Sequence, residues 1–341
     1  MRHLKILLLI VLSFLLETPE GLGQLGRSYQ EGLAYLRAEK LDLAEKSFRE
    51  ALNDLAAPPE VHYQLAWIYL RWGQRDKAAE SASLFVAARP ESAEGQYVLG
   101  YALFGLGKFA AAIAPLSKSV EVKSDNADAF KILGLCYFLE GQQSLAERAL
   151  SAAVKLNPQS TEAHYFLGRI YYTLNIFDKA KLAFETTIKL DPQFMKGYDN
   201  LGLTLDALGQ DEEAEKSYRK AIELNERLAV SSEWPFFNLG EFLVKRDRAP
   251  EAMDYLKRAI ALKPSWGKPR VVLGKAYLLL GSTEKALAEF TQSAERDPQY
   301  AEGYYQLGQL YRRMGNLEAS DGALKRFREL RSEPEQSKIL K

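Results

Sequence analysis

The side chains best suited to catalysis or metal binding are few and far apart in this sequence. His62 and His164 are about a hundred residues apart, His3 lies near the N-terminus, and Cys136 is the only cysteine. A metal site or an activated nucleophile needs several such groups brought together. The local signatures of serine hydrolases, zinc proteases, P-loop proteins and dinucleotide-binding enzymes are also missing from the sequence. We therefore expect no enzyme activity, no metal and no cofactor.

Composition narrows the remaining classes of function. The 341 residues are 47% hydrophobic and 26% charged, and the formal net charge is zero. This apolar content is enough to bury a core, and the charge is typical of a soluble protein. A nucleic-acid partner is not expected, because proteins that bind nucleic acids usually carry a basic excess. The balanced charge gives no support for an electrostatic attraction to anionic membranes either.

The elements that must position any binding residues repeat every 34 residues. Residues 133–158 read LGLCYFLEGQQSLAERALSAAVKLNP, and residues 167–192 read LGRIYYTLNIFDKAKLAFETTIKLDP. Leu-Gly, a tyrosine, an alanine, a large apolar residue and a closing proline fall at the same places in both. The same frame extends in both directions and defines nine repeats, residues 25–58, 59–92, 93–126, 127–160, 161–194, 195–228, 233–266, 267–300 and 301–334.

Each repeat has the pattern of a helical hairpin. Apolar residues at positions 7, 10 and 11, and again at 20, 24, 27 and 28, follow a helical period. Glycine or asparagine near position 15 is expected to end the first helix, since these residues adopt a left-handed conformation at low cost. Small residues at positions 8 and 20 allow close approach of the two helices, and a large residue at position 24 fills the space beside them. Proline at position 32 ends the second helix in several repeats.

These spacings resemble those of the tetratricopeptide-repeat (TPR) family across residues 25–334. The resemblance implies an all-α fold, a right-handed α-solenoid of about nine TPR helical hairpins. Glu31, Ala82 and Ser320 depart from the usual residues at their positions. Between the sixth and seventh repeats the frame slips by four residues, which predicts either one extra turn on the preceding helix or a longer loop.

The resemblance also implies where a partner would bind, because stacked hairpins line a concave groove with their first helices. In this family, positions 2, 5, 9, 12 and 13 face the groove. The second to fifth repeats are rich in aromatic residues at these positions, and basic residues lie among them. The predicted partner-binding residues are Tyr63, Trp67, Arg71, Tyr97, Tyr101, Phe104, Lys131, Phe138, Tyr165, Arg169 and Tyr172.

The predicted function is that of a protein–protein interaction scaffold that binds a peptide segment of a partner in this groove. The alternative is a structural component of an envelope or secretion complex without a discrete peptide ligand. Two binding modes known in the family fit poorly. The chaperone-tail clamp needs asparagine at position 9, where no repeat has it, and the asparagine ladder of sugar-transferring relatives is reduced to Asn200 and Asn238.

The N-terminal segment resembles a secretory signal peptide. Arg2 and Lys5 precede the apolar run Ile6 to Leu16, and Gly21 and Gly23 follow two residues apart. Eleven apolar residues span about 16 Å as a helix, short of the ~30 Å hydrocarbon core of a membrane. We expect a signal peptide over residues 1–23 and an exported, periplasmic or secreted protein; an uncleaved anchor is the alternative. No lipid anchor is expected, because no cysteine lies near the cleavage region. Residues 335–341 form a C-terminal tail.

Overall fold

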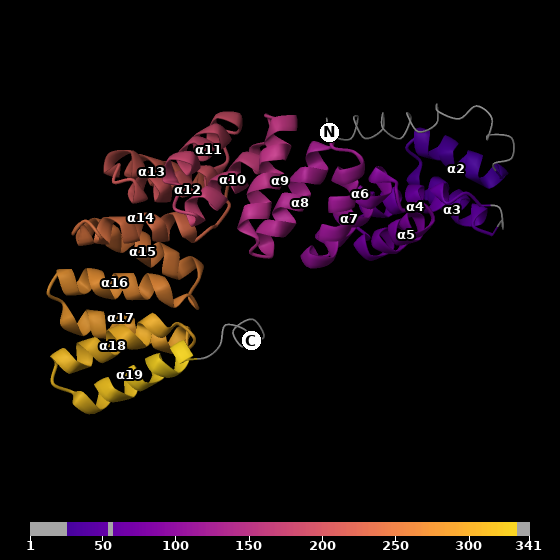
Figure 1. Cartoon of the computed structure of the whole chain (residues 1–341). Helices are drawn as coiled ribbons and strands as arrows, with labels where there is room; N and C mark the ends of the chain where they lie inside the picture. The colour runs from indigo at the N-terminus through magenta and orange to yellow at the C-terminus, as the bar shows by residue number, and fades with distance from the viewer. Residues whose placement is uncertain (1–25, 54–56, 333–341) are drawn as a thin grey trace. The chain divides into compact units, whose positions relative to one another are not determined.

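The computed structural model describes residues 26–53 and 57–332, and all regular elements in this part of the chain are α-helices. Figure 1 shows them as successive antiparallel pairs. The predicted all-α stack of helical hairpins is therefore confirmed. The predicted signal peptide and C-terminal tail lie outside the described residues.

The chain divides into two compact units, one ending at Pro158 and one beginning at Gln159. The helices of the first compact unit are α2 (Arg27–Arg37), α3 (Leu41–Ala51), α4 (Glu60–Arg71), α5 (Arg75–Ala88), α6 (Ala93–Gly105), α7 (Phe109–Val122), α8 (Ala127–Leu139) and α9 (Gln143–Leu156). Those of the second are α10 (Thr161–Thr173), α11 (Phe177–Leu190), α12 (Met195–Ala207), α13 (Asp211–Arg227), α14 (Trp234–Val244), α15 (Ala249–Leu262), α16 (Gly267–Leu279), α17 (Thr283–Arg296), α18 (Ala301–Arg313) and α19 (Leu317–Ser332).

From α4 to α8 in the first compact unit, and throughout the second, each first helix of a hairpin also packs against the first helix of the next hairpin. In the first compact unit α4 contacts α6, and α6 contacts α8. In the second, the same series runs from α10 through α12, α14 and α16 to α18. The first helices therefore form one continuous row from α4 to α8 and another from α10 to α18. Residues on successive first helices can share one face.

The two helices of a hairpin pack together through the contact between positions 8 and 24 that the sequence predicts. A Cβ atom placed on Gly168 would lie 2.6 Å from Cε1 of Phe184, which is closer than real Cβ atoms come to a neighbour. Phe184 is fully buried. Gly134 meets Leu150 in the same way, and Gly274 meets Phe290. Glycine at position 8 thus lets the large residue of the second helix lie directly on the first helix.

The second repeat solves the same packing problem with different residues. Ala66 replaces the usual glycine and Ala82 replaces the usual large residue, and both are fully buried. The aromatic ring is instead supplied by Phe85, three residues later, and it lies against Gly95 at the start of the next repeat. The departure at Ala82 is therefore compensated, and it places Phe85 beneath the face of α4 and α6.

The turn inside each hairpin uses a left-handed residue at position 15. Six glycines and Asn175 take this conformation, as predicted, with φ between 58° and 81°. Glu39 and Asp247 occupy the same position in the first and seventh repeats, with φ of 58° and 57°. The same left-handed turn therefore forms in the two repeats that have glutamate or aspartate, and not glycine or asparagine, at this position.

The four-residue slip lengthens α13, which has 17 residues against 14 in α11. A short loop then leads to α14, which begins at Trp234 with Pro235 in its first turn. The buried Asn225 holds this loop: its Nδ2 donates to the Ser232 carbonyl at 2.8 Å, and its Oδ1 accepts from the Ser232 amide at 2.9 Å. The extra residues thus provide both more helix and a fixed loop. Among the described residues, no helix has the length and apolarity needed to cross a membrane.

Candidate partner-binding face

Four aromatic side chains on α4 and α6 form a continuous row of rings, which we call the aromatic ladder. Tyr63 and Trp67 lie one turn apart on α4, with ring centroids 6.4 Å apart in an edge-on arrangement. Trp67 meets Tyr97 of α6 at 6.4 Å, and Tyr97 stacks on Tyr101 at 6.0 Å with 14° between the ring planes. The ladder therefore joins two adjacent first helices, and all four of its residues belong to the predicted partner-binding set.

Small and apolar side chains support the ladder from below. Ala66, Ala82 and Val98 are buried, and Tyr63, Trp67 and Tyr97 pack against this cluster. The ring of Phe85 lies 5.2 Å from the ring of Tyr63. Because a tightly packed support restricts the rotamers of the rings above it, the ladder is preorganised for binding.

The ladder is partly open to solvent and rich in hydrogen-bond donors. Tyr101 is 39% exposed, and the other three residues are half-buried. Burial raises the pKa of Tyr63 to about 12 and raises that of Tyr97 further, with help from the charge of Asp128. These hydroxyl groups therefore stay protonated at neutral pH. The Trp67 Nε1–H is buried and makes no hydrogen bond of normal geometry among the described residues, although it lies close enough to the Tyr63 hydroxyl to offset part of the rise in the pKa of that tyrosine.

The other predicted residues of the first compact unit lie around the ladder. Phe104, at the end of α6, packs against Phe109 at 5.6 Å and is half-buried. Phe138 lies on α8 and is also half-buried. Lys131 forms an ion pair with Asp128 at 3.1 Å, so its charge is partly balanced. Arg71 ends α4 and is exposed.

The three predicted residues of the fifth repeat belong to the second compact unit. Tyr165 is only 7% exposed, because Phe166, Phe184 and Phe194 surround its ring at 5.2, 6.0 and 5.0 Å. The structure thus places Tyr165 in the core and not on an open groove surface. The Arg169 guanidinium lies over the Tyr165 ring at 5.9 Å. Tyr172 is half-buried and packs edge-on against Phe177 at 5.6 Å.

The first helices of the second compact unit carry polar residues that bind one another. Asp199 of α12 is buried, and both of its carboxylate oxygens accept from Asn238 Nδ2 of α14, at 2.9 and 3.0 Å. Burial raises the pKa of Asp199 to about 7, and the amide of Asn238 only partly offsets this. Asn200 donates to the Lys196 carbonyl at 2.9 Å. Both asparagines of the predicted fragmentary ladder are therefore engaged inside the fold.

Lysines on the same row of helices are paired with carboxylates. Lys268 lies 3.7 Å from Glu241 and also covers the ring of Phe237 at 4.5 Å. Lys275 lies 3.3 Å from Glu302. Because these lysines are already paired with carboxylates of the same chain, the first helices of the second compact unit are a less favourable binding surface than the aromatic ladder.

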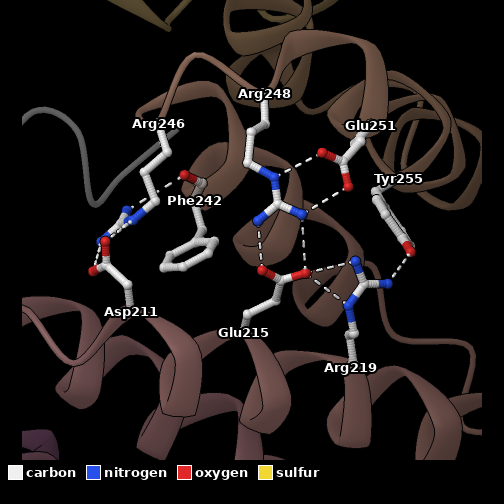
Figure 2. A network of polar contacts seen from close by, with 8 residues as sticks. All are labelled: Asp211, Glu215, Arg219, Phe242, Arg246, Arg248, Glu251 and Tyr255. Atoms are coloured by element: carbon white, nitrogen blue, oxygen red, sulfur yellow. Dashed lines mark hydrogen bonds and ion pairs between the residues drawn. The ribbon is translucent and has the colours of Figure 1, made fainter.

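Sequence reasoning missed a network of ion pairs between two hairpins of the second compact unit, which Figure 2 shows. Arg248 lies between two carboxylates, with Nη1 2.5 Å from Glu215 and Nε 2.7 Å from Glu251. Glu215 also accepts from Arg219 at 2.6 Å, and Arg219 donates to the Tyr255 hydroxyl at 2.9 Å. The guanidinium groups of Arg248 and Arg219 hold the pKa of Glu215 below its usual range.

Arg246 extends this network to the preceding hairpin. Its guanidinium pairs with Asp211 and covers the ring of Phe242 at 3.8 Å (Figure 2). It also pairs with Asp206 at 2.8 Å. The network therefore fastens the turn between α14 and α15 to α13 and to the end of α12. Arg246 and Arg248 flank Asp247 in the sequence, but their partners on the preceding hairpin, Asp206, Asp211 and Glu215, are more than 30 residues away.

Among the described residues, no group of three or more His, Cys, Asp or Glu side chains could hold a metal ion. Cys136 is buried, and burial raises the pKa of its thiol to about 12. The face that the geometry favours for binding is therefore the aromatic ladder and its surroundings.

Comparison with known families agrees with the repeat pattern and the hairpin geometry. Models described as tetratricopeptide repeat match residues 63–121, 97–145 and 141–193, and a second such model matches residues 196–227 and 301–330. A model described as TPR repeat matches residues 274–315. Together the matches cover more than half of the chain. The chain belongs to the tetratricopeptide-repeat family.

Solved structures show the same fold at low identity. The Cut9–Hcn1 hetero-tetramer of APC/C is 18% identical, with a TM-score of 0.57 over 80% of this chain and 52% of that one. A tetratricopeptide repeat protein from Parabacteroides merdae ATCC 43184 is 16% identical, with a TM-score of 0.56 over 74% and 98%. The MamA protein is 30% identical over 50% of this chain and 93% of that one, with a TM-score of 0.47. No significant match is found among curated proteins.

Proposed function

We propose that the chain is a non-catalytic scaffold that holds a segment of a partner protein on the aromatic ladder. The observation that carries this proposal is the continuous row of four supported rings on α4 and α6, which ends at the exposed Tyr101. Aromatic side chains dominate binding hot spots, because they bury a large area at a small cost in conformational entropy. TPR proteins are typically scaffolds of this kind, which supports the proposal.

The test begins with partners captured on the purified chain and continues with peptide mapping of the bound segment. Trp67→Ala and Tyr101→Ala should each weaken binding of the mapped segment by about 2 kcal/mol, roughly 30-fold. Trp67→Phe is the matched control, because it keeps an aromatic ring, although a smaller one, and the N–H group that it removes makes no hydrogen bond among the described residues. Far-UV circular dichroism checks that each variant is folded.

Two further controls lie in the second compact unit. Tyr305→Ala removes an aromatic side chain that is 36% exposed, close to the exposure of Tyr101, but outside the ladder. Lys268→Ala removes a paired surface charge, which should contribute less than ~1 kcal/mol. If the Lys268 variant loses the partner and the ladder variants keep it, the proposed site is wrong. If the captured partner is a folded multi-subunit complex, and its affinity is unchanged by all of these substitutions, the structural-component alternative is favoured.

We also propose that the chain is exported and that its mature form begins near Gln24. The support is the charged, apolar and small-residue order of the first 23 residues. N-terminal sequencing of the protein from its native cell tests this proposal. An intact Met1 on a cytosolic product would contradict it.

A further inference from the structure

The second repeat differs from the other repeats in where its large core residue stands. Elsewhere position 24 holds a large residue, such as Leu116 in the third repeat, and the second repeat has Ala82 there and Phe85 at position 27. We call this arrangement the reversed order. It moves the bulk that usually lies inside a hairpin to the space between this hairpin and the next. In the first repeat and in the third to eighth, position 27 holds a small buried residue: Ala51, Ser119, Ala153, Thr187, Ala221, Ala259 and Ser293.

Phe85 lies where α5 meets both helices that carry the aromatic ladder. Its side chain is 2% exposed, and its ring centroid is 5.2 Å from that of Tyr63 on α4. On α6, a Cβ atom placed on Gly95 would lie 2.5 Å from Cδ1 and Cε1 of Phe85. The Gly95 amide also donates to Ser92 Oγ at 3.1 Å, which fixes the start of α6 at this contact. Phe85 therefore packs between α4 and α6 and needs a glycine on α6 to do so.

The other half of the reversed order, the small residue at position 24, lies under the middle of the ladder. The rings of Trp67 and Tyr97 pack against the cluster that contains Ala82. Tyr101 in turn stacks on Tyr97. Each half-buried ring of the ladder is thus supported by a consequence of the reversed order, and Tyr97 transmits this support to the exposed ring.

Hairpin stability does not require the reversed order. Eight repeats pack through a glycine at position 8 and a large residue at position 24. Rearrangements that conserve core volume usually cost little stability. The ladder, in contrast, depends on the positions of both Ala82 and Phe85, because these residues contact its rings directly.

We infer that Phe85 is a positioning residue of the partner-binding face, and that the reversed order of Ala82 and Phe85 serves partner binding and not the stability of the hairpin. This inference rests on the proposed function and adds the residues that order its rings. Rings held in place before binding lose less conformational entropy when a partner is bound.

The main variant restores the usual order without changing the composition of the chain. It combines Ala66→Gly, Ala82→Phe, Phe85→Ala and Gly95→Ala, and we call it the reordered variant. Phe85→Leu is a second, milder variant that leaves a smaller side chain under Tyr63. Phe290→Leu is the matched control, because Phe290 is a fully buried phenylalanine in the second compact unit.

The first measurement follows the ladder without any ligand. The full chain is labelled with 5-fluorotryptophan, and the ¹⁹F resonance of Trp67 is assigned with Trp67→Phe. We expect this resonance to shift or broaden in the reordered variant and in Phe85→Leu, and to stay as in the original chain in Phe290→Leu. A loss of stability alone would not produce this difference between Phe85→Leu and Phe290→Leu.

The second measurement uses peptides enriched from a library of random 12-residue peptides on the immobilised full chain. Those that lose binding to Tyr101→Ala are kept, and fluorescence polarisation gives their affinities. The reordered variant and Phe85→Leu should each weaken binding about tenfold, because one or two loosened rings must then be ordered when the peptide binds. Phe290→Leu should leave the affinity unchanged. Urea unfolding should show that the reordered variant is as stable as the original chain within about 1.5 kcal/mol.

The outcomes separate this inference from the proposed function. Peptides that depend on Tyr101 but bind the reordered variant and Phe85→Leu as tightly as the original chain would overturn the inference and leave the scaffold function supported. An unchanged Trp67 resonance in both variants would also overturn it. A reordered variant that does not fold would overturn it too, because the reversed order would then serve the fold itself. A library that yields no peptide dependent on Tyr101 would overturn the proposed function, and the inference with it.

Discussion

The buried carboxyl group of Asp199 makes the stability of the second compact unit depend on pH. Its carboxylate has no cationic partner among the contacts that the structure describes, only the amide of Asn238. Burial raises its pKa from 3.8 to about 7. Asp199→Asn removes the charge and keeps a side chain of the same shape, which can still bond to Asn238.

The sign of the effect follows from the raised pKa. Well below pH 4 the carboxyl group is protonated in both the folded and the unfolded chain, so its ionisation does not lower the free energy of unfolding. As the pH rises toward 7, the unfolded chain loses its proton first, and the stability of the folded chain falls. Three pKa units correspond to about 4 kcal/mol in total, of which about 3 kcal/mol is lost between pH 5 and pH 8.

The assay is urea unfolding at pH 5 and pH 8, in a background where Trp67 and Trp72 are replaced by Phe. Fluorescence then reports on Trp234 and Trp266, which both lie in the second compact unit. The free energy of unfolding of Asp199→Asn, relative to that of the parent chain, should increase by about 3 kcal/mol from pH 5 to pH 8.

Glu185→Gln is the control for this assay, because it neutralises an exposed carboxylate in the same compact unit. It should leave the pH dependence as it is in the parent chain. Equal pH dependence in the parent and in Asp199→Asn would refute the reasoning, since it would mean that Asp199 is not a buried charge.

Three further predictions concern packing, ion pairing and the turns. Phe184→Ala should cost about 3–5 kcal/mol and Gly168→Leu about 1–3 kcal/mol in urea unfolding, since one leaves a cavity and the other overpacks the same contact; native-like stability of both would refute the packing. Arg248→Ala should cost about 1 kcal/mol, less at high salt, because its pairs with Glu215 and its neighbours are partly exposed; a cost independent of salt would contradict an electrostatic origin. Glu39→Gly should raise the melting temperature, with a gain of about 1 kcal/mol, because glycine removes a left-handed strain; a lower melting temperature would show that the Glu39 side chain stabilises the turn.

The helical hairpins could be predicted from sequence because the residues that build them recur in every repeat. Gly168 and Phe184 represent a contact that eight of the nine repeats make with small variations, so the repeat itself reveals the packing. The left-handed turn at Glu39 could not be predicted from residue type, since glutamate seldom adopts that conformation, whereas aspartate, as at Asp247, tolerates it better. The packed helices on both sides fix the turn, and the local cost is offset by the hairpin contacts.

The candidate site was only partly predictable, because position in the repeat sets the face of a helix but not how deeply a side chain is buried. Tyr101 and Tyr165 stand at groove-facing positions by the same numbering. Tyr101 is exposed, whereas Phe166, Phe184 and Phe194 enclose Tyr165. The two residues stand at positions 9 and 5 of their repeats, and the rings that enclose Tyr165 come from its own repeat, so its burial depends on which residues occupy the positions around it.

The same reasoning explains why function in such an array resides in residues that do not repeat. Asp199 and Asn238 are 39 residues apart and meet only because their first helices are adjacent, and Lys268 finds Glu241 in the same way. In these pairs, side chains at variable positions bond to each other. The pairs make the packing of neighbouring helices specific, and the Asp199 pair makes stability depend on pH. On α4 and α6 the variable positions are aromatic instead, and Tyr101 keeps an exposed ring on a fixed support. A binding site requires a surface whose conformation is already fixed and which is not covered by other parts of the protein. This is the physical reason for proposing that the partner binds at the aromatic ladder.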